Sequence, residues 1–119
     1  MNLFKSLAEI EPIARFAEHG GEGPIHFRRI FSRPEFATPI DFIDYTRIPP
    51  GSSIGRHEHS GNEEMYFIVE GQPLVRLNGE ERRLQKGSFA IVRDGEWHEL
   101  INDRDEVAEI LVIQVSGVH

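Results

Sequence analysis

The fold is decided by residues 51–71, GSSIGRHEHSGNEEMYFIVEG. Within this stretch, residues 54–59 and 64–70 have the composition of two β-strands, and Ser60-Gly61-Asn62 between them is typical of a turn. Side chains two apart in a strand face the same side, so His57 and His59 can direct two imidazoles at one point. This spacing favours a metal-ligand pair, although a His-x-His pair also occurs on strands that bind no metal.

Glu64 joins the two histidines only if the turn resets the alternation of the strand. In a straight continuation from His59, Glu64 would face the opposite side. The turn Ser60-Gly61-Asn62 can bring its carboxylate back to the histidine side. Glu63 is the competing carboxylate, and we prefer Glu64 because Tyr66 and Ile68 then follow on its face.

His98 supplies the fourth candidate ligand. It follows the turn at residues 93–96 and opens a predicted strand, which a hairpin can bring beside the first pair. The chain has no cysteine, so any metal must bind to nitrogen and oxygen. Three imidazoles and one carboxylate suit a single divalent ion such as Fe, Mn, Ni or Zn, and they leave two positions of a six-coordinate ion open. We therefore expect a metal site formed by His57, His59, Glu64 and His98.

The spacing of these residues resembles that of the cupin superfamily. Its first motif is matched by Gly51, His57, His59, Glu64 and Gly71, and its second by Gly87, Gly95, His98 and Asn102. Arg93 stands where cupins usually have proline. The short linker between Gly71 and Gly87 is similar to that of small bacterial members. The resemblance implies an all-β, double-stranded β-helix, the jelly-roll cupin barrel, with the metal at its mouth on His57, His59, Glu64 and His98.

The remaining sequence agrees with an all-β fold. After Gly23-Pro24, short apolar runs alternate with turn residues. The predicted strands cover residues 25–31, 42–48, 54–59, 64–70, 74–77, 81–84, 88–92, 97–101 and 107–115. Asn78-Gly79 is the strongest hairpin signal. Apolar residues from Leu3 to Ala17, at spacings of three and four, predict a short N-terminal helix, although Pro12 interrupts the pattern. We expect residues 1–23 to form a helical or extended arm and residues 24–119 to form the barrel.

Composition narrows the class of protein. A chain of 119 residues suits one domain, and its net charge of -7 argues against a nucleic-acid partner. No apolar run is long enough for a membrane span, and we expect neither a secretory signal nor a membrane partner, with a cytoplasmic location as the default.

Several residues are candidates for contact with a substrate or for proton transfer. Tyr66 and Glu63 are the possible catalytic residues, and His26 is a further possible base. Candidates for substrate contact are Arg93, His26, Phe89, Trp97 and Gln114. For Arg93 the alternative is a surface turn residue paired with Asp94 or Glu96. His19 and His119 are interpreted as loop and terminus residues.

The resemblance implies a metal-dependent enzyme that acts on a small polar or carboxylated molecule. It would be either a dioxygenase, and so an oxidoreductase, or a Lewis-acid isomerase, decarboxylase or lyase. The alternative is a non-catalytic cupin that binds a small sugar or acid. Small cupins commonly dimerise, so we also expect a homodimer that uses the N-terminal arm with Phe27, Ile30, Phe31 and Phe36.

Overall fold

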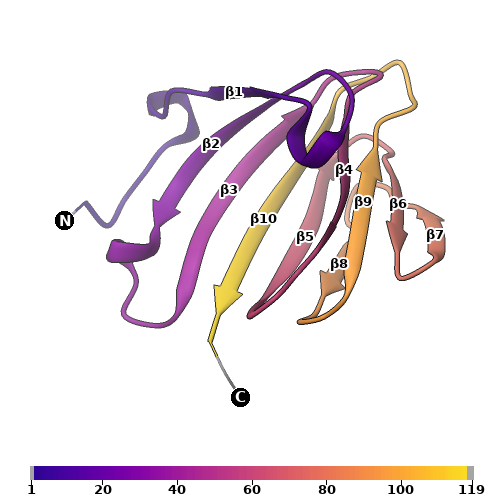
Figure 1. Ribbon diagram of the computed structural model, residues 1–119. Helices are drawn as coiled ribbons and strands as arrows, with labels where there is room; N and C mark the ends of the chain where they lie inside the picture. Colours follow the sequence, from indigo (N-terminus) through magenta and orange to yellow (C-terminus); the bar gives the residue numbers. More distant parts are fainter. Residues whose placement is uncertain (1, 118–119) are drawn as a thin grey trace.

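Two antiparallel β-sheets contain nearly all the regular structure (Figure 1). The computed structural model describes residues 2–117. One sheet has six strands in the order β1-β2-β3-β10-β5-β8, and the other has four in the order β4-β9-β6-β7. The strand bounds are β1 Ile13–Phe16, β2 Pro24–Ser32, β3 Ile40–Ile48, β4 Ser53–Glu58, β5 Asn62–Glu70, β6 Leu74–Leu77, β7 Glu80–Arg83, β8 Phe89–Val92, β9 Trp97–Ile101 and β10 Ala108–Ser116. The all-β prediction is confirmed, and each predicted strand matches one of β2 to β10 within two residues at either end.

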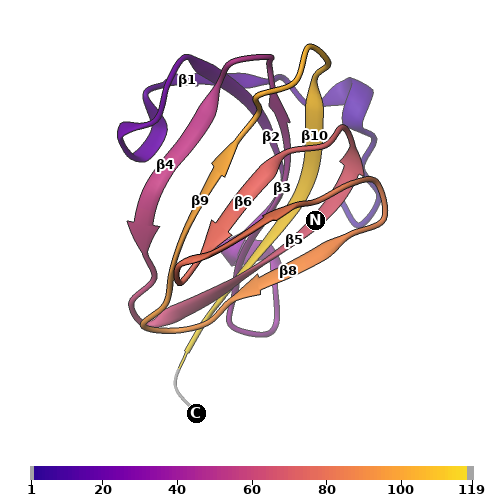
Figure 2. The ribbon, with the colours of Figure 1, turned by 90° about the vertical axis from the view of Figure 1, so that its right-hand side faces the viewer.

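The core lies between the inner faces of the two sheets. Figure 2 shows β4, β9 and β6 in front of β2, β3 and β10. Fully buried side chains come from both layers, among them Ile48, Ile68, Leu100 and Ile110. In the described residues, no strand of one sheet is hydrogen-bonded to a strand of the other. The strands therefore form an open sandwich rather than a closed barrel.

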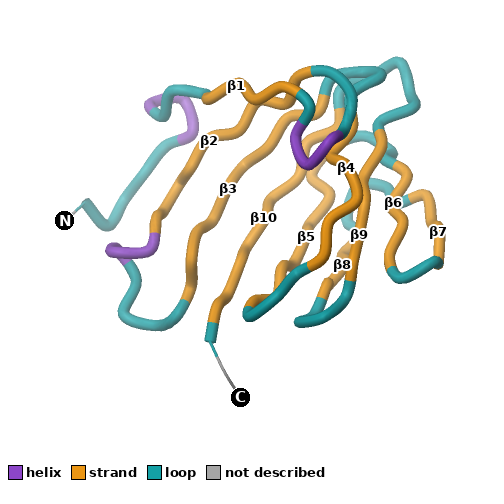
Figure 3. The backbone as a smooth tube through the Cα atoms, in the orientation of Figure 1, coloured by secondary structure: helices purple, strands orange, loops and turns teal. Residues whose placement is uncertain are grey.

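The predicted N-terminal helix is wrong. Residues 2–117 contain no α-helix and only three short 3₁₀ turns, at Leu7–Glu9, Glu18–Gly20 and Arg33–Glu35 (Figure 3). Pro12 has no backbone N–H and disfavours a continuous helix. The residues that follow it form β1, which pairs with the edge of the six-stranded sheet and satisfies its backbone groups there. None of the helical turns in the described chain is long and apolar enough to cross a membrane.

Alternation along β2 determines which of its side chains face the interior. Ile25 and Phe27 are 4% and 5% exposed, whereas His26 alternates with them and faces the other side of the sheet. Phe27 is therefore unavailable for the dimer contact that we expected of it. The homodimer itself stays a prediction, and His119 lies outside the described residues.

Candidate metal centre

The structure brings His57, His59, Glu64 and His98 together inside the sandwich. One ligand atom from each residue lies within 4.8 Å of the others. The Nε2 atom of His98 is 2.8 Å from Nε2 of His59 and 2.9 Å from Nε2 of His57. His98 is fully buried, and Glu64 is 8% exposed. We call these four residues the metal cluster.

Strand register places the cluster. His57 on β4 pairs directly with His98 on β9, and residues opposite each other on neighbouring strands face the same side. His59 follows the end of β4, and Gly61 in the next turn has a φ of 77°, which favours glycine. After this turn Glu64, Tyr66 and Ile68 are the buried residues of β5. The turn therefore resets the alternation as predicted, and Glu64 rather than Glu63 reaches the cluster.

The spacing of the nitrogen atoms fits a single cation. Two nitrogens bound at about 2.1 Å in adjacent positions of a six-coordinate ion lie about 3.0 Å apart, close to the separations in the cluster. The other ring nitrogens have their own partners: Nδ1 of His57 lies 2.9 Å from the carbonyl oxygen of Gly55, and Nδ1 of His59 contacts Oδ1 of Asn62. With Nδ1 donating, the Nε2 lone pairs face the cluster, where a cation would satisfy them.

Burial sets the charge of the cluster. It lowers the pKa of His57 to about 4 and that of His98 to about 2, so both imidazoles are neutral, which is the form that binds metal. Burial, together with the negative charge of Asp44, raises the pKa of Glu64 to about 8. A divalent cation would offset this cost by pairing with the carboxylate.

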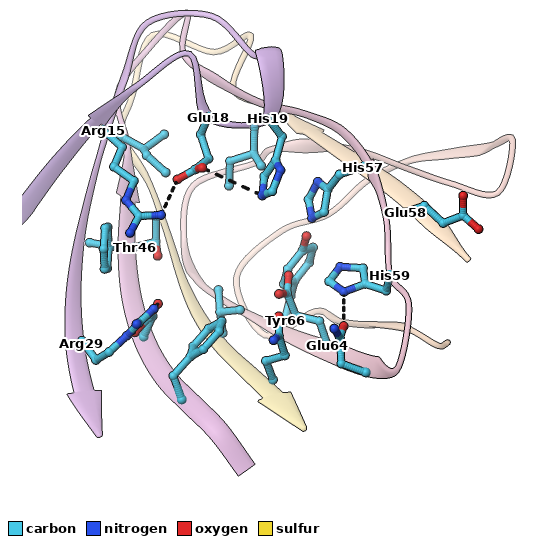
Figure 4. Close-up of a pocket in the computed structure, with 18 residues that line it drawn as sticks. Arg15, Glu18, His19, Arg29, Thr46, His57, Glu58, His59, Glu64 and Tyr66 are labelled. Carbon is cyan, nitrogen blue, oxygen red and sulfur yellow. Dashed lines mark hydrogen bonds and ion pairs between the residues drawn. The ribbon is translucent and has the colours of Figure 1, made fainter. Parts of the chain in front are cut away.

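The cluster borders a cavity of about 330 Å³ (Figure 4). The cavity wall has an apolar part, made by Ile25, Phe27, Phe42, Ile54 and Val112, and a polar part that includes Arg15, Glu18, His19, Arg29, Asp44, Thr46, Tyr66 and Gln114. This volume is at the lower end of the range for small-molecule sites, and the mixture of apolar surface with a few polar groups is typical of them.

Tyr66 and Gln114 are the two further candidate residues that the structure brings to this cavity. The hydroxyl of Tyr66 contacts Nδ1 of His98 and lies 3.2 Å from its Nε2 atom. The amide nitrogen of Gln114 donates to Asp41 at 2.9 Å. Tyr66 thus lies beside the cluster, within reach of a molecule bound there.

The other candidates lie away from the cavity, because alternation along their strands turns them outward. His26 faces away from buried Ile25 and Phe27, and Trp97 alternates with His98 and lies under the guanidinium of Arg56. Phe89 on the edge strand β8 is 74% exposed.

Glu63, near the start of β5, and Arg93 line a separate surface depression. Arg93 is paired with Glu96 at 3.1 Å, and 69% of its side chain is exposed. Arg93 therefore lies in a surface turn, paired with Glu96, as the alternative interpretation had it. The side chain of Glu63 lines the surface depression and not the cavity beside the cluster.

Sequence reasoning missed several polar residues of the cavity wall, among them Arg15, Glu18, His19 and Arg29. The imidazole of His19 stacks on that of His57, with ring centroids 3.7 Å apart and planes 12° apart. Arg29 could have been found, because it shares the inward alternation of Ile25 and Phe27. No sequence signal placed Arg15, Glu18 or His19, since their position depends on the pairing of β1 with β2.

The chain is similar to proteins of known family. It is 27% identical to an oxalate-binding protein of Thermotoga maritima over 106 residues, which are 89% of this chain and 88% of that protein. It is 33% identical over 75 residues to the tetracenomycin polyketide synthase protein TcmJ of Streptomyces glaucescens, covering 63% of this chain and half of that protein.

Solved structures agree with these matches. A predicted oxalate decarboxylase from Thermotoga maritima superimposes with a TM-score of 0.94 at 25% identity, covering 97% of this chain and 100% of that one. The polyketide cyclase RemF from Streptomyces resistomycificus has a TM-score of 0.79 at 18% identity over 97% of this chain and 80% of its own, which shows a shared fold alone. The family model of the cupin domain matches residues 44–114, more than half of the chain and all four cluster residues. This chain therefore belongs to the cupin family.

Proposed function

We propose that this cupin is a metal-dependent enzyme that acts on a small polar or carboxylated molecule bound in the cavity beside the cluster. The observation that carries the proposal is the convergence of three imidazole nitrogens and one carboxylate, of which those of His57, His59 and Glu64 line the cavity. Four protein ligands leave two positions of a six-coordinate ion for a bidentate ligand or for a ligand and O₂. Fe, Mn, Ni or Zn fits this set of donors.

A bound ion would supply Lewis acidity and, if it is redox-active, a means of using O₂. The residues of the chain supply orientation and proton transfer. Gly55 and Asn62 fix the rings of His57 and His59 through their Nδ1 atoms. The hydroxyl of Tyr66, next to His98, can donate a hydrogen bond to a ligand oxygen beside the cluster or hold a proton there. We therefore assign Tyr66 as the candidate catalytic residue.

Elemental analysis of the freshly purified protein, followed by turnover assays, tests this function. The assays use small dicarboxylates, keto acids, catechols and sugar phosphates, with O₂ uptake and product formation measured separately. Bound iron with O₂ uptake supports a dioxygenase. Bound manganese, nickel or zinc with product formed without O₂ uptake supports an isomerase, decarboxylase or lyase. Tyr66→Phe should retain the metal and lose turnover. The proposal is contradicted if the wild-type protein binds no metal, or if it converts none of these compounds.

The alternative function is non-catalytic binding of a small acid. The relative from Thermotoga maritima that matches 89% of the chain is named as an oxalate-binding protein, which favours this alternative. A metal-loaded sample that binds oxalate saturably, and converts neither oxalate nor the other compounds, would support it. In that case Tyr66→Phe would change the affinity for oxalate and nothing else.

A further inference from the structure

Two arginine side chains line the cavity, and one of them, Arg29, is hydrogen-bonded to a carboxylate of the protein. Arg29 donates from Nε and Nη2 to the two carboxylate oxygens of Asp44, each at 2.9 Å. Asp44 is 6% exposed, and the guanidinium of Arg29 lies 4.4 Å from the centre of the Phe42 ring. This two-pronged, partly buried pair balances the charge of Arg29 and uses one edge of its guanidinium, so Arg29 is the weaker of the two candidates for binding an anionic ligand.

Arg15 is the stronger candidate. Its one ion pair in the described chain joins Nη1 to Glu18 at 3.4 Å, longer than the roughly 2.7–2.9 Å of a strong charged hydrogen bond. The side chain is 52% exposed, and its guanidinium lies 4.7 Å from the centre of the Phe27 ring. An arginine has five N–H donors, so Arg15 can still bind a carboxylate with two parallel hydrogen bonds.

The backbone directs Arg15 into the cavity. In the pairing of β1 with β2, Arg15 lies opposite Ile25, so both side chains are on the side of the sheet that borders the cavity. Figure 4 shows Arg15 across the cavity from His57 and His59, with Glu18 and His19 along the same rim. We call residues 13–23 the N-terminal cap.

The N-terminal cap is held firmly against β4. The backbone N–H of Glu22 donates to the hydroxyl of Ser53 at 2.8 Å, and the N–H of Ser53 donates to the carbonyl of Glu22 at 2.8 Å. Gly21 lies so close that a Cβ atom there would be 2.3 Å from the carbonyl oxygen of Ser53. Arg15 is therefore presented from a docked element, which favours recognition of a ligand over a surface role.

Apolar side chains also line the cavity. Ile25, Phe27, Ile54 and Val112 line it together with Arg15 and the histidines. We propose that the ligand is an acid with a metal-binding group at one end, an apolar middle, and a second carboxylate that Arg15 binds at the other end. This inference rests on the proposed function, because the metal holds the first group. A compact acid such as oxalate would use both carboxylates at the metal and leave Arg15 without a role.

Two six-carbon acids of equal length test the inference. Binding of 2-oxoadipate and of 2-oxohexanoate, which has a methyl group in place of the distal carboxylate, is measured by calorimetry on metal-loaded protein. We expect the protein to prefer 2-oxoadipate by at least about tenfold, the size of one good charged hydrogen-bonding pair. Arg15→Gln should remove this preference and leave the affinity for 2-oxohexanoate unchanged, and Arg15→Lys should keep part of it.

Two further variants sharpen the test. Arg82→Gln, which changes an exposed arginine on β7 outside the cavity, should keep the full preference. Glu18→Gln should increase the preference, because it removes the negative charge beside Arg15. Circular dichroism and metal content verify that each variant is folded and loaded.

The outcomes separate this inference from its premise. If wild-type protein binds the two acids equally, or if Arg15→Gln keeps the preference, the role of Arg15 is wrong and the metal-dependent function stands. If neither acid binds to metal-loaded protein, both the inference and the metal-dependent function on keto acids are overturned.

Discussion

The metal cluster and the N-terminal cap face the same cavity but are built in different ways. The cluster sits on β4, β5 and β9, its members are largely buried, and the pairing of His57 with His98 fixes its geometry. The cap consists of a four-residue strand, all of it exposed, and a 3₁₀ turn, and it depends on its contacts with β2 and β4. On the proposals above, the sheets hold the residues that bind the metal, while the cap carries the residue that selects the ligand. Substitutions in the two regions should therefore have separable effects.

The largest expected effect is that of His98→Ala, which should abolish metal binding. His98 is fully buried and its Nε2 atom is within 2.9 Å of both other cluster histidines, so its loss removes a ligand atom from the centre of the cluster. The measurement is the ratio of metal to protein after purification. His26→Ala, on the outer side of β2, is the control and should keep full occupancy. Full occupancy in His98→Ala would contradict the assignment of the cluster.

The next largest effect on metal affinity is expected at Glu64, with the neighbouring Glu63 as the comparison. Glu64→Gln should weaken metal affinity by at least about 100-fold, because it removes a charged ligand, while Glu63→Gln should leave the affinity unchanged. Competition with a chelator of known affinity measures both. Equal losses in the two variants would mean that the turn at Gly61 does not hold Glu64 inward in solution.

The effect of pH on metal affinity should be smaller and should come from Glu64. The raised pKa, about 8, means that metal binding at neutral pH must displace a proton from this carboxyl group. Affinity should therefore fall as the pH decreases, by about tenfold per unit between pH 8 and 6. His57, with its lowered pKa of about 4, adds no proton competition in this range.

Metal titrations at pH 6, 7 and 8 measure this dependence. Glu64→Gln is the matched control, and its weaker affinity should change little over the same range. A slope that persists in Glu64→Gln would assign the competing proton to a histidine instead.

The smallest effect on the metal is expected from a change in the cap. Gly21→Ala places a Cβ atom against the backbone of Ser53 and should push the cap away from β4, at a cost of about 1–3 kcal/mol in the free energy of unfolding. Thermal unfolding of the metal-loaded protein measures this loss. Metal affinity should stay within about twofold of wild type, because no cluster residue belongs to the cap. A large loss of metal would show that the two regions are coupled, through the stacking of His19 on His57.

Much of the fold and of the cluster could be predicted because the relevant signals are local. Alternation along a strand has a period of two, so it placed His57 with His59 and, after the turn, Glu64 with Tyr66. The same rule, applied to β2 and β9, would have turned His26 and Trp97 outward and Arg29 inward. The chemistry of a side chain favours it as a site residue, but its strand position decides which side of the sheet it faces.

The position of the N-terminal segment could not be predicted in this way. Its spacing of apolar residues favoured a helix, but Pro12 and the unpaired edge of β2 favoured a strand instead. For the same reason, the sequence did not predict that this strand and the following turn bring Arg15, Glu18 and His19 to the cavity rim.

By itself, the sequence determined the strand pattern, the cupin motifs and the identity of the four cluster residues, because strand alternation, turn chemistry and motif spacing are properties of short segments. Tertiary structure decided the rest: the open arrangement of two sheets, the cavity, and the approach of Arg15 and His19 to a metal cluster tens of residues away in the chain. The physical reason is that edge pairing and sheet packing join segments distant in sequence, and no local pattern specifies which edge a short terminal strand will satisfy.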